Sequence, residues 1–141
     1  LWIGEHFPAL DGLLASHPNA CLLFPGKEGE GNSVLRLQAI SGPSLLIVPD
    51  GTWRKARQII RANPLLDSLP RLSLPPGAPS EYRVRRASEP AAVATIEAIV
   101  RALELLEPGS DFQPLLRPFH VLVEQQIKAM GEEVYLRNHA R

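Results

Sequence analysis

The hydrophobic pattern of the chain alternates between short unbroken apolar runs and longer segments with helical spacing. The apolar runs occupy residues 20–24 and 45–48, and each is followed by a proline. Because neither run alternates with polar residues, both predict strands buried on two faces, as in a parallel sheet. Helical spacing predicts helices over 8–16, 52–62, about 90–106 and about 114–130. Together the elements predict an α/β fold, a mostly parallel sheet flanked by helices.

The segment 64–80 holds five of the fourteen prolines, so we expect no regular helix there. We predict a wandering connection with two short strands, at about 71–74 and 82–85, that join the sheet. A chain of 141 residues can bury a core without metal or disulfide support, and we expect one compact domain.

Composition is that of an ordinary globular protein, with 45% apolar and 21% charged residues, which excludes a disordered or collagen-like chain. Fifteen Lys and Arg balance fifteen Asp and Glu, and this zero net charge taken alone argues against a strongly basic nucleic-acid binder. The distribution changes that picture, because residues 50–88 carry eight basic and three acidic side chains. A centre of +5 between flanks that sum to −5 favours a polyanion-binding face, and a solvated basic surface is the alternative.

Several sequence features bear on where the protein works. The longest stretch without charged residues, 12–26, is shorter than the roughly 20 apolar residues of a membrane span, so we expect no membrane partner. The single cysteine, Cys21, excludes an internal disulfide and a Cys-rich zinc site within these residues, and it fits a cytoplasmic protein. The four histidines lack metal-ligand spacing, so we predict no metal site.

Glycine-containing loops follow both predicted strands, at 24–26 and 49–53. Ligands of open α/β sheets bind outside the carboxyl ends of the strands, where such loops lie. Gly51 permits close approach of the backbone to a ligand, and Thr52 or Asp50 can cap the next helix, whose first amides attract anions. These residues indicate a ligand site, with an ordinary capped turn as the alternative.

Basic residues crowd the start of the helix that follows. Arg54, Lys55 and Arg57 lie where the helix dipole disfavours positive charge, and no acidic residue follows until Asp67. We therefore expect these cations to meet an external anion such as a phosphate or carboxylate. Trp53 could stack on a base, although a tryptophan at this place is more often a packing anchor.

A second basic cluster covers residues 80–86. In a strand, Arg83 and Arg85 share one face, and Tyr82 and Arg86 share the other. Aromatic and arginine side chains together are typical of RNA-binding surfaces, while protection of an edge strand by charge is the alternative. Further along the chain, Glu97 taken alone is a first-turn helix acid with Arg101 four residues later.

Four ordered motifs together are more specific than any one of them. They are Leu22-Leu23-Phe24-Pro25, Asp50-Gly51-Thr52-Trp53, Ser80-x-Tyr82-x-x-Arg85 and Thr95-Ile96-Glu97-Ala98. In this order they resemble the DTW-domain family, which is similar to the SPOUT-like, often knotted α/β enzymes that bind S-adenosylmethionine. The resemblance covers most of the chain and implies a single S-adenosylmethionine-binding domain over residues 1–141. It also implies a tRNA-uridine aminocarboxypropyltransferase, which moves the 3-amino-3-carboxypropyl group to N3 of uridine and releases methylthioadenosine.

The resemblance assigns roles to residues of this chain. The cofactor-binding residues it implies are Leu23, Phe24, Pro25, Gly26, Pro49, Asp50, Gly51, Thr52, Trp53, Thr95 and Glu97. The residues it leaves to hold tRNA or the methionine carboxylate are Arg54, Lys55, Arg57, Tyr82, Arg83, Arg85 and Arg86. Because N3 of uridine must lose a proton, we expect a carboxylate base, Asp50 first and Glu97 in reserve. A role for Asp50 in holding the cofactor, an RNA methyltransferase and a non-catalytic RNA-binding module are the alternatives.

The chain departs from the family pattern at two places. Family members usually begin with a cysteine cluster suited to zinc and a Thr-Asn-Thr-Gly segment, and this chain starts downstream of both. We therefore expect a missing N-terminal segment, through which alone zinc would bind. The family usually has Ser where this chain has Ala94. Losing an N-cap hydroxyl costs about 1 kcal/mol, and we expect Thr95 to replace it as the cap.

Overall fold

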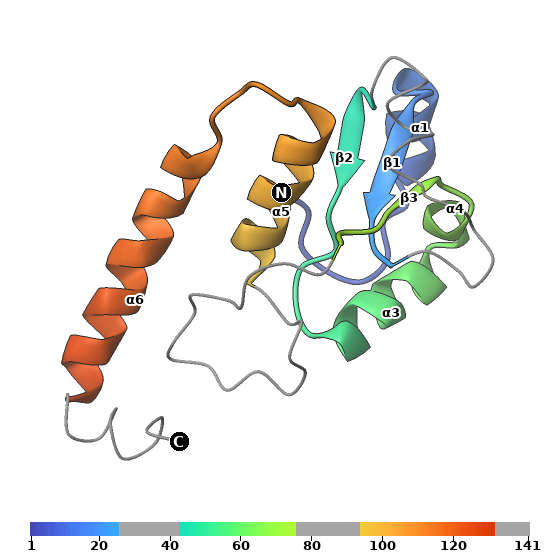
Figure 1. The fold of residues 1–141 in the computed structure, drawn as a ribbon. Coiled ribbons are helices and arrows are strands. Elements are labelled where there is room, and N and C mark those ends of the chain that lie inside the picture. The colour runs from blue at the N-terminus through green and yellow to red at the C-terminus, as the bar shows by residue number, and fades with distance from the viewer. Residues whose placement is uncertain (26–42, 76–93, 132–141) are drawn as a thin grey trace. The chain divides into compact units, whose positions relative to one another are not determined.

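The computed structural model describes residues 1–25, 43–75 and 94–131 (Figure 1). The chain divides into two compact units, Leu1–Leu74 and Pro75–Arg141, and each unit is described by itself. The strand predicted at 82–85 lies outside the described residues.

The first unit contains a three-stranded parallel sheet of strands β1 (Ala20–Leu23), β2 (Leu45–Ile47) and β3 (Arg71–Leu72). The strand order is β2-β1-β3, with Cys21 opposite Leu46 and Leu23 opposite Leu72. β1 is buried at all of its positions because it has a neighbour on each side, whereas β2 is only partly buried. The predicted α/β class with a parallel sheet is confirmed, and burial on both faces is confirmed for β1 alone.

Three helices of this unit pack together beside the sheet: α1 (Leu10–Ser16), α3 (Trp53–Ala62) and α4 (Pro64–Asp67). They contribute Leu10, Ile59 and Leu66 to one buried cluster, against which Ile47 of β2 packs. Each of these side chains is withdrawn from water, which contributes about 1.5 to 3 kcal/mol when burial is complete. The predicted helices at 8–16 and 52–62 are confirmed within two residues at each end.

Helix α4 corrects the expectation that 64–80 contains no regular helix. Its four residues form one turn that begins at Pro64. Proline is tolerated at the first helical position, because its missing N–H would have no intrahelical partner there and its φ already suits a helix. The predicted connection follows this turn, and the predicted strand at 71–74 is confirmed but shortened to Arg71–Leu72.

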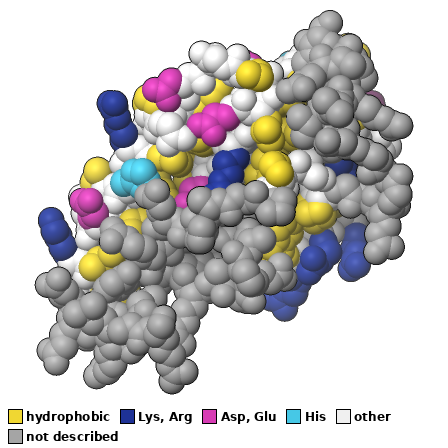
Figure 2. Space-filling view, viewed as in Figure 1, with side chains coloured by type: hydrophobic (Ala, Val, Ile, Leu, Met, Phe, Trp, Pro, Cys, Tyr) yellow, Lys and Arg dark blue, Asp and Glu magenta, His cyan; other side chains and the backbone are white. Residues whose placement is uncertain are grey.

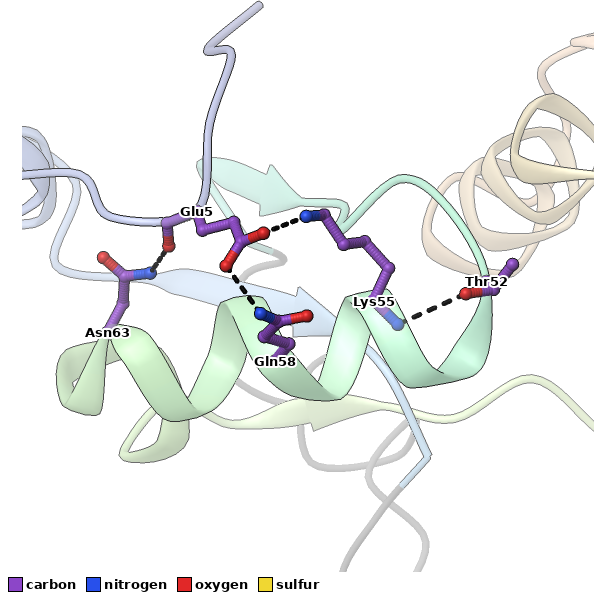
Figure 3. Close-up of polar contacts among 5 residues, drawn as sticks. All are labelled: Glu5, Thr52, Lys55, Gln58 and Asn63. Carbon is purple, nitrogen blue, oxygen red and sulfur yellow. Dashed lines mark hydrogen bonds and ion pairs between the residues drawn. The ribbon is translucent and has the colours of Figure 1, made fainter.

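Asn63 ties the N-terminal segment of this chain, residues 1–9, to the end of α3 (Figure 3). Its side chain is buried, and its Nδ2 donates to the carbonyl oxygens of Glu5 (2.6 Å) and Ile59 (2.7 Å). Its Oδ1 accepts from the backbone N–H of Phe7 at 2.9 Å. One buried amide thus fixes residues 5–7 along the helix, because both its donor and its acceptor groups are used.

The second unit contains α5 (Thr95–Leu106), the short 3-10 helix η1 (Gln113–Leu116) and α6 (Arg117–Met130). The helix predicted from about 114 is therefore divided, with Pro114 in η1 and Pro118 in the first turn of α6. Each proline occupies an early helical position, where its lack of an N–H costs no bond. Among the described residues, no helix is long and apolar enough to cross a membrane.

The start of α5 overturns the expectation that Thr95 is the cap. Ala94 occupies the N-cap position with an extended backbone (φ −66°, ψ 152°), and Thr95 is already the first helical residue. The Glu97 carboxylate instead reaches back and accepts from the Ala94 backbone N–H at 2.6 Å. The acidic half of a capping box therefore forms without the hydroxyl half, since a third-position glutamate can bond the N-cap amide by itself.

Candidate functional site

The two loops singled out by the sequence begin at the carboxyl ends of neighbouring parallel strands. β1 leads into Phe24-Pro25, and β2 leads through Val48 into Pro49-Asp50-Gly51-Thr52. Because β1 and β2 pair in parallel, their carboxyl ends lie at the same edge of the sheet. Leu23, the last residue of β1, is buried at this edge.

An aromatic contact joins the two loops. The Phe24 and Trp53 rings pack edge to face, with centroids 5.6 Å apart and planes at 70°. Such a pair contributes roughly 0.5 to 1.5 kcal/mol beyond the area it buries. Trp53 therefore has a packing role at the start of α3, and the structure brings together residues of the first two sequence motifs.

Arg71 of β3 supports the loop that follows β1. Its guanidinium donates to the carbonyl oxygen of Pro25 at 3.0 Å and to the Asp67 carboxylate at 2.6 Å, and it lies 5.5 Å from the centre of the Phe24 ring. The side chain is only 9% exposed, and its Nε is buried without a hydrogen-bond partner within the described residues. Burying an arginine is costly unless it is paired, so this side chain is held by three contacts of different kinds.

The loop after β2 is shaped by its own backbone and by the helix cap. Gly51 has φ +127°, a conformation that L side chains rarely adopt. Thr52 is the N-cap of α3, with an extended backbone, and its hydroxyl accepts from the Lys55 backbone N–H at 3.3 Å. Asp50 is exposed, and Pro49 is partly buried beside it. The loop therefore presents a carboxylate next to a glycine and a helix N-terminus.

The cations at the start of α3 do not all have the same surroundings. Arg54 and Arg57 are exposed, whereas Lys55 is partly buried and forms an ion pair with Glu5 (Figure 3). Gln58 donates to the other oxygen of the same carboxylate at 2.8 Å. The acid that partners Lys55 thus comes from the N-terminal segment, 50 residues earlier in the chain.

The residues of the fourth sequence motif belong to the second unit. Thr95 begins α5, and Glu97 is buried, 5% exposed, with one carboxylate oxygen bonded to the Ala94 amide. Glu97 therefore stabilises the start of its own helix. Gly26, Tyr82, Arg83, Arg85 and Arg86 lie outside the described residues.

In the part of the chain that the structure describes, no group of three or more His, Cys, Asp or Glu side chains lies close enough together to hold a metal ion. Cys21 is fully buried in β1, and burial raises the pKa of its thiol to about 11. A thiol that stays protonated is a poor nucleophile and a poor metal ligand, so Cys21 is a packing residue.

Two structurally important residues of this region were not predicted. Arg71 carried a signal in the sequence, because an arginine inside a predicted buried strand needs a partner and Asp67 precedes it by four residues. Glu5 carried none, since nothing in a sequence pattern links positions 5 and 55.

Comparison with known proteins gives one family and a set of relatives. The family model described as "DTW domain" matches residues 2–127. The chain is similar to a protein named "tRNA-uridine aminocarboxypropyltransferase 2" from Drosophila melanogaster, with 27% identity over 86% of this chain and 50% of the relative. Proteins of the same name match from Mus musculus (30% identity, 83% of this chain, 41% of the relative) and from Macaca fascicularis (31%, 76% and 36%).

The chain therefore spans half or less of the length of these curated relatives. No solved structure matches it.

Proposed function

The chain belongs to the DTW-domain family, and from this premise we propose that it transfers the 3-amino-3-carboxypropyl group of S-adenosylmethionine to N3 of a uridine in tRNA. The proposal includes a single catalytic domain that works in the cytoplasm. It is supported by the names of the relatives and by one observation of the structure: the Phe24 loop and the Asp50 loop begin at the same edge of a parallel sheet and touch through Phe24 and Trp53.

The donor would bind at this edge of the sheet. Leu23, Phe24 and Pro25 would form one side of its pocket, and residues 49–53 would form the other. Gly26, which the family resemblance also assigns to the donor, lies outside the described residues. Gly51 leaves room for close backbone approach, and the first amides of α3 favour the methionine carboxylate. Thr95 and Glu97, which the family resemblance also assigns to the donor, belong to the second unit, where Glu97 caps α5.

The reaction needs one proton transfer and one displacement. A carboxylate removes the N3 proton of uridine, the N3 lone pair attacks the carbon next to sulfur, and the carbon–sulfur bond breaks. The sulfonium leaves as the neutral thioether of methylthioadenosine, so no acid is required. Asp50 is the proposed base, because it is exposed at the loop where the donor would bind and lies next to Gly51, whose positive φ shapes that loop.

A transfer assay with the Asp50→Asn variant tests the proposal. Wild-type protein, S-adenosylmethionine and tRNA should give a nucleoside heavier by an aminocarboxypropyl group, and Asp50→Asn should lower the rate by roughly 100-fold or more. Asp11→Asn, a change of the same kind at an exposed position of α1, is the matched control and should leave the rate unchanged.

Two results of this assay, and one result of calorimetry with S-adenosylmethionine, would count against the proposal. A product heavier by a methyl group would replace the reaction with methyl transfer. Normal turnover by Asp50→Asn would remove this carboxylate from the mechanism. Calorimetry separates its two possible roles, because a base variant still binds S-adenosylmethionine, whereas a variant that has lost a donor contact does not. No donor binding by the wild-type protein would leave only an RNA-binding module.

A further inference from the structure

Helix α3 has three distinct faces. Ala56, Ile59 and Ile60 are buried and face the core. At 3.6 residues per turn, Arg54, Arg57 and Arg61 fall within about 60° of one another, away from that buried face. All three side chains are exposed. Figure 2 shows basic side chains projecting from the surface on the side where α3 lies in Figure 1.

The third face of α3 is covered by the N-terminal segment (Figure 3). Glu5 pairs with Lys55 through one carboxylate oxygen and accepts from Gln58 through the other. Asn63 holds the Glu5 backbone at the end of the same helix. The charge of Lys55 is therefore balanced inside the protein, and its ammonium points toward Glu5 rather than along the arginine face.

The three arginines have no such partner within the described residues. None of them forms an ion pair or hydrogen bond there, and the first turn of α3 contains no acidic residue. Like charges at these spacings repel one another, and a cation at the position of Arg54 is also opposed by the helix dipole. The row is thus an arrangement that an external polyanion would stabilise.

We propose that Arg54, Arg57 and Arg61 form a phosphate-binding row for the tRNA backbone, and that Lys55 is not part of it. The row extends about 10 Å along the helix, over which one strand of a duplex carries about three phosphates. Guanidinium groups suit this ligand because they donate two parallel hydrogen bonds to a phosphate. The choice of tRNA as the RNA rests on the proposed function, whereas phosphate binding by the row does not.

Salt-dependent binding to RNA tests the row directly. We would titrate the full chain, without S-adenosylmethionine, with tRNA and with an RNA of equal length that lacks uridine, at several salt concentrations. The variant with Arg54→Gln, Arg57→Gln and Arg61→Gln should bind both RNAs roughly tenfold or more weakly. Its slope of log affinity against log salt should be smaller in magnitude by about two to three.

Lys55→Gln provides the matched control, because it removes the same charge from the same helix. It should leave the salt slope nearly unchanged and should instead lower the melting temperature, since it breaks the contact with Glu5. Arg57→Lys should keep the slope, because the charge remains. Far-UV circular dichroism of the triple variant should match the wild type, because the altered side chains are all exposed.

The outcomes separate the row from the enzyme activity. An unchanged slope in the triple variant, or an equal loss of slope in Lys55→Gln, would overturn the row even if transfer activity is normal. Tighter binding of a polyglutamate peptide than of RNA would overturn RNA as its occupant. The expected slopes in a protein without transfer activity would support the row and count against the proposed reaction.

Discussion

The two loops at the ends of β1 and β2 lie at the same edge of the sheet but are held in place by different means. The loop after β1 is fixed from outside, by Arg71 from β3 and by the Trp53 ring. The loop after β2 is fixed from within, by the positive φ of Gly51 and by the Thr52 cap. The first therefore depends mainly on tertiary contacts, and the second, apart from the contact of Trp53 with Phe24, on the conformations of its own residues.

This difference suits the chemistry proposed for each loop. A wall of a donor pocket must keep its position when a ligand enters, and a buried side chain with several partners provides that rigidity. A loop that carries a reacting carboxylate must leave it accessible, and Asp50 is exposed. Each loop can be weakened separately, so the comparison predicts a different result for each.

The largest effect is expected for Arg71→Ala. The change removes a nearly buried side chain together with its bonds to Pro25 and Asp67, so the free energy of unfolding should fall by about 3 to 4 kcal/mol. Phe24 also loses the cation beside its ring. Chemical denaturation measures the loss, and fluorescence in a Trp2→Phe background should show Trp53 emission shifted to longer wavelength.

Arg71→Met separates packing from polar support at the same position. Methionine refills much of the volume, and replacing a buried charge by an apolar side chain is often nearly neutral for stability. Most of the stability should return. The Pro25 carbonyl, however, still has no hydrogen-bond partner in place of the guanidinium, so S-adenosylmethionine should bind more weakly than to the wild type. Full recovery of both properties in this variant would show that Arg71 acts only by filling space.

The sequence predicts the elements of this region better than it predicts their contacts. The strands at 20–24 and 45–48 and the helix at 52–62 are predicted correctly because each has an unambiguous apolar pattern, although only the first strand is buried at every position. The pairing of Glu5 with Lys55 could not be predicted, because no local pattern connects residues 50 positions apart. Thr95 was misplaced as a cap for another reason, since the helix begins at Thr95 itself, with Ala94 as the N-cap and its amide bonded to Glu97.

The candidate site shows the same division. Sequence motifs indicated the Phe24 and Asp50 loops because parallel strands place their carboxyl ends at one edge. The contact between Phe24 and Trp53 depends on how α3 packs, and the support from Arg71 depends on β3 joining β1 rather than β2. Both are consequences of tertiary packing, which a pattern of single residues does not encode.

A second prediction concerns Cys21 in β1, the strand that leads into the loop supported by Arg71. Burial raises the pKa of the Cys21 thiol to about 11, above its ordinary value of 9.0, so the native state keeps this proton after the unfolded chain has lost it. Between pH 9 and pH 11 the unfolded state therefore binds fewer protons, and stability must fall as pH rises. The contribution of Cys21 should drop by about 2 kcal/mol by pH 11.

The measurement is the difference in unfolding free energy between the wild type and Cys21→Ala as pH rises. Comparing the two proteins cancels the titration of other groups, and the stability advantage of the wild type should shrink as the pH rises above 9. The thiol of the folded protein should also resist a thiol reagent at pH 8. A difference that stays constant from pH 7 to pH 11 would mean that water reaches β1.

The smallest effect is expected for Gly51→Ala, which weakens the loop held from within. A Cβ at φ +127° is strained, and it would lie 3.3 Å from Cβ and Cγ of Lys55, so stability should fall by about 1 to 2 kcal/mol. Gly12→Ala is the matched control, because a Cβ there meets nothing within 4 Å and alanine favours a helix interior. It should stabilise the protein by about 0.5 to 1 kcal/mol. Because Gly51 adjoins Asp50, Gly51→Ala should also lose more transfer activity than its loss of stability explains. A loss of activity no larger than the loss of stability predicts would contradict the proposed place of this loop in the site.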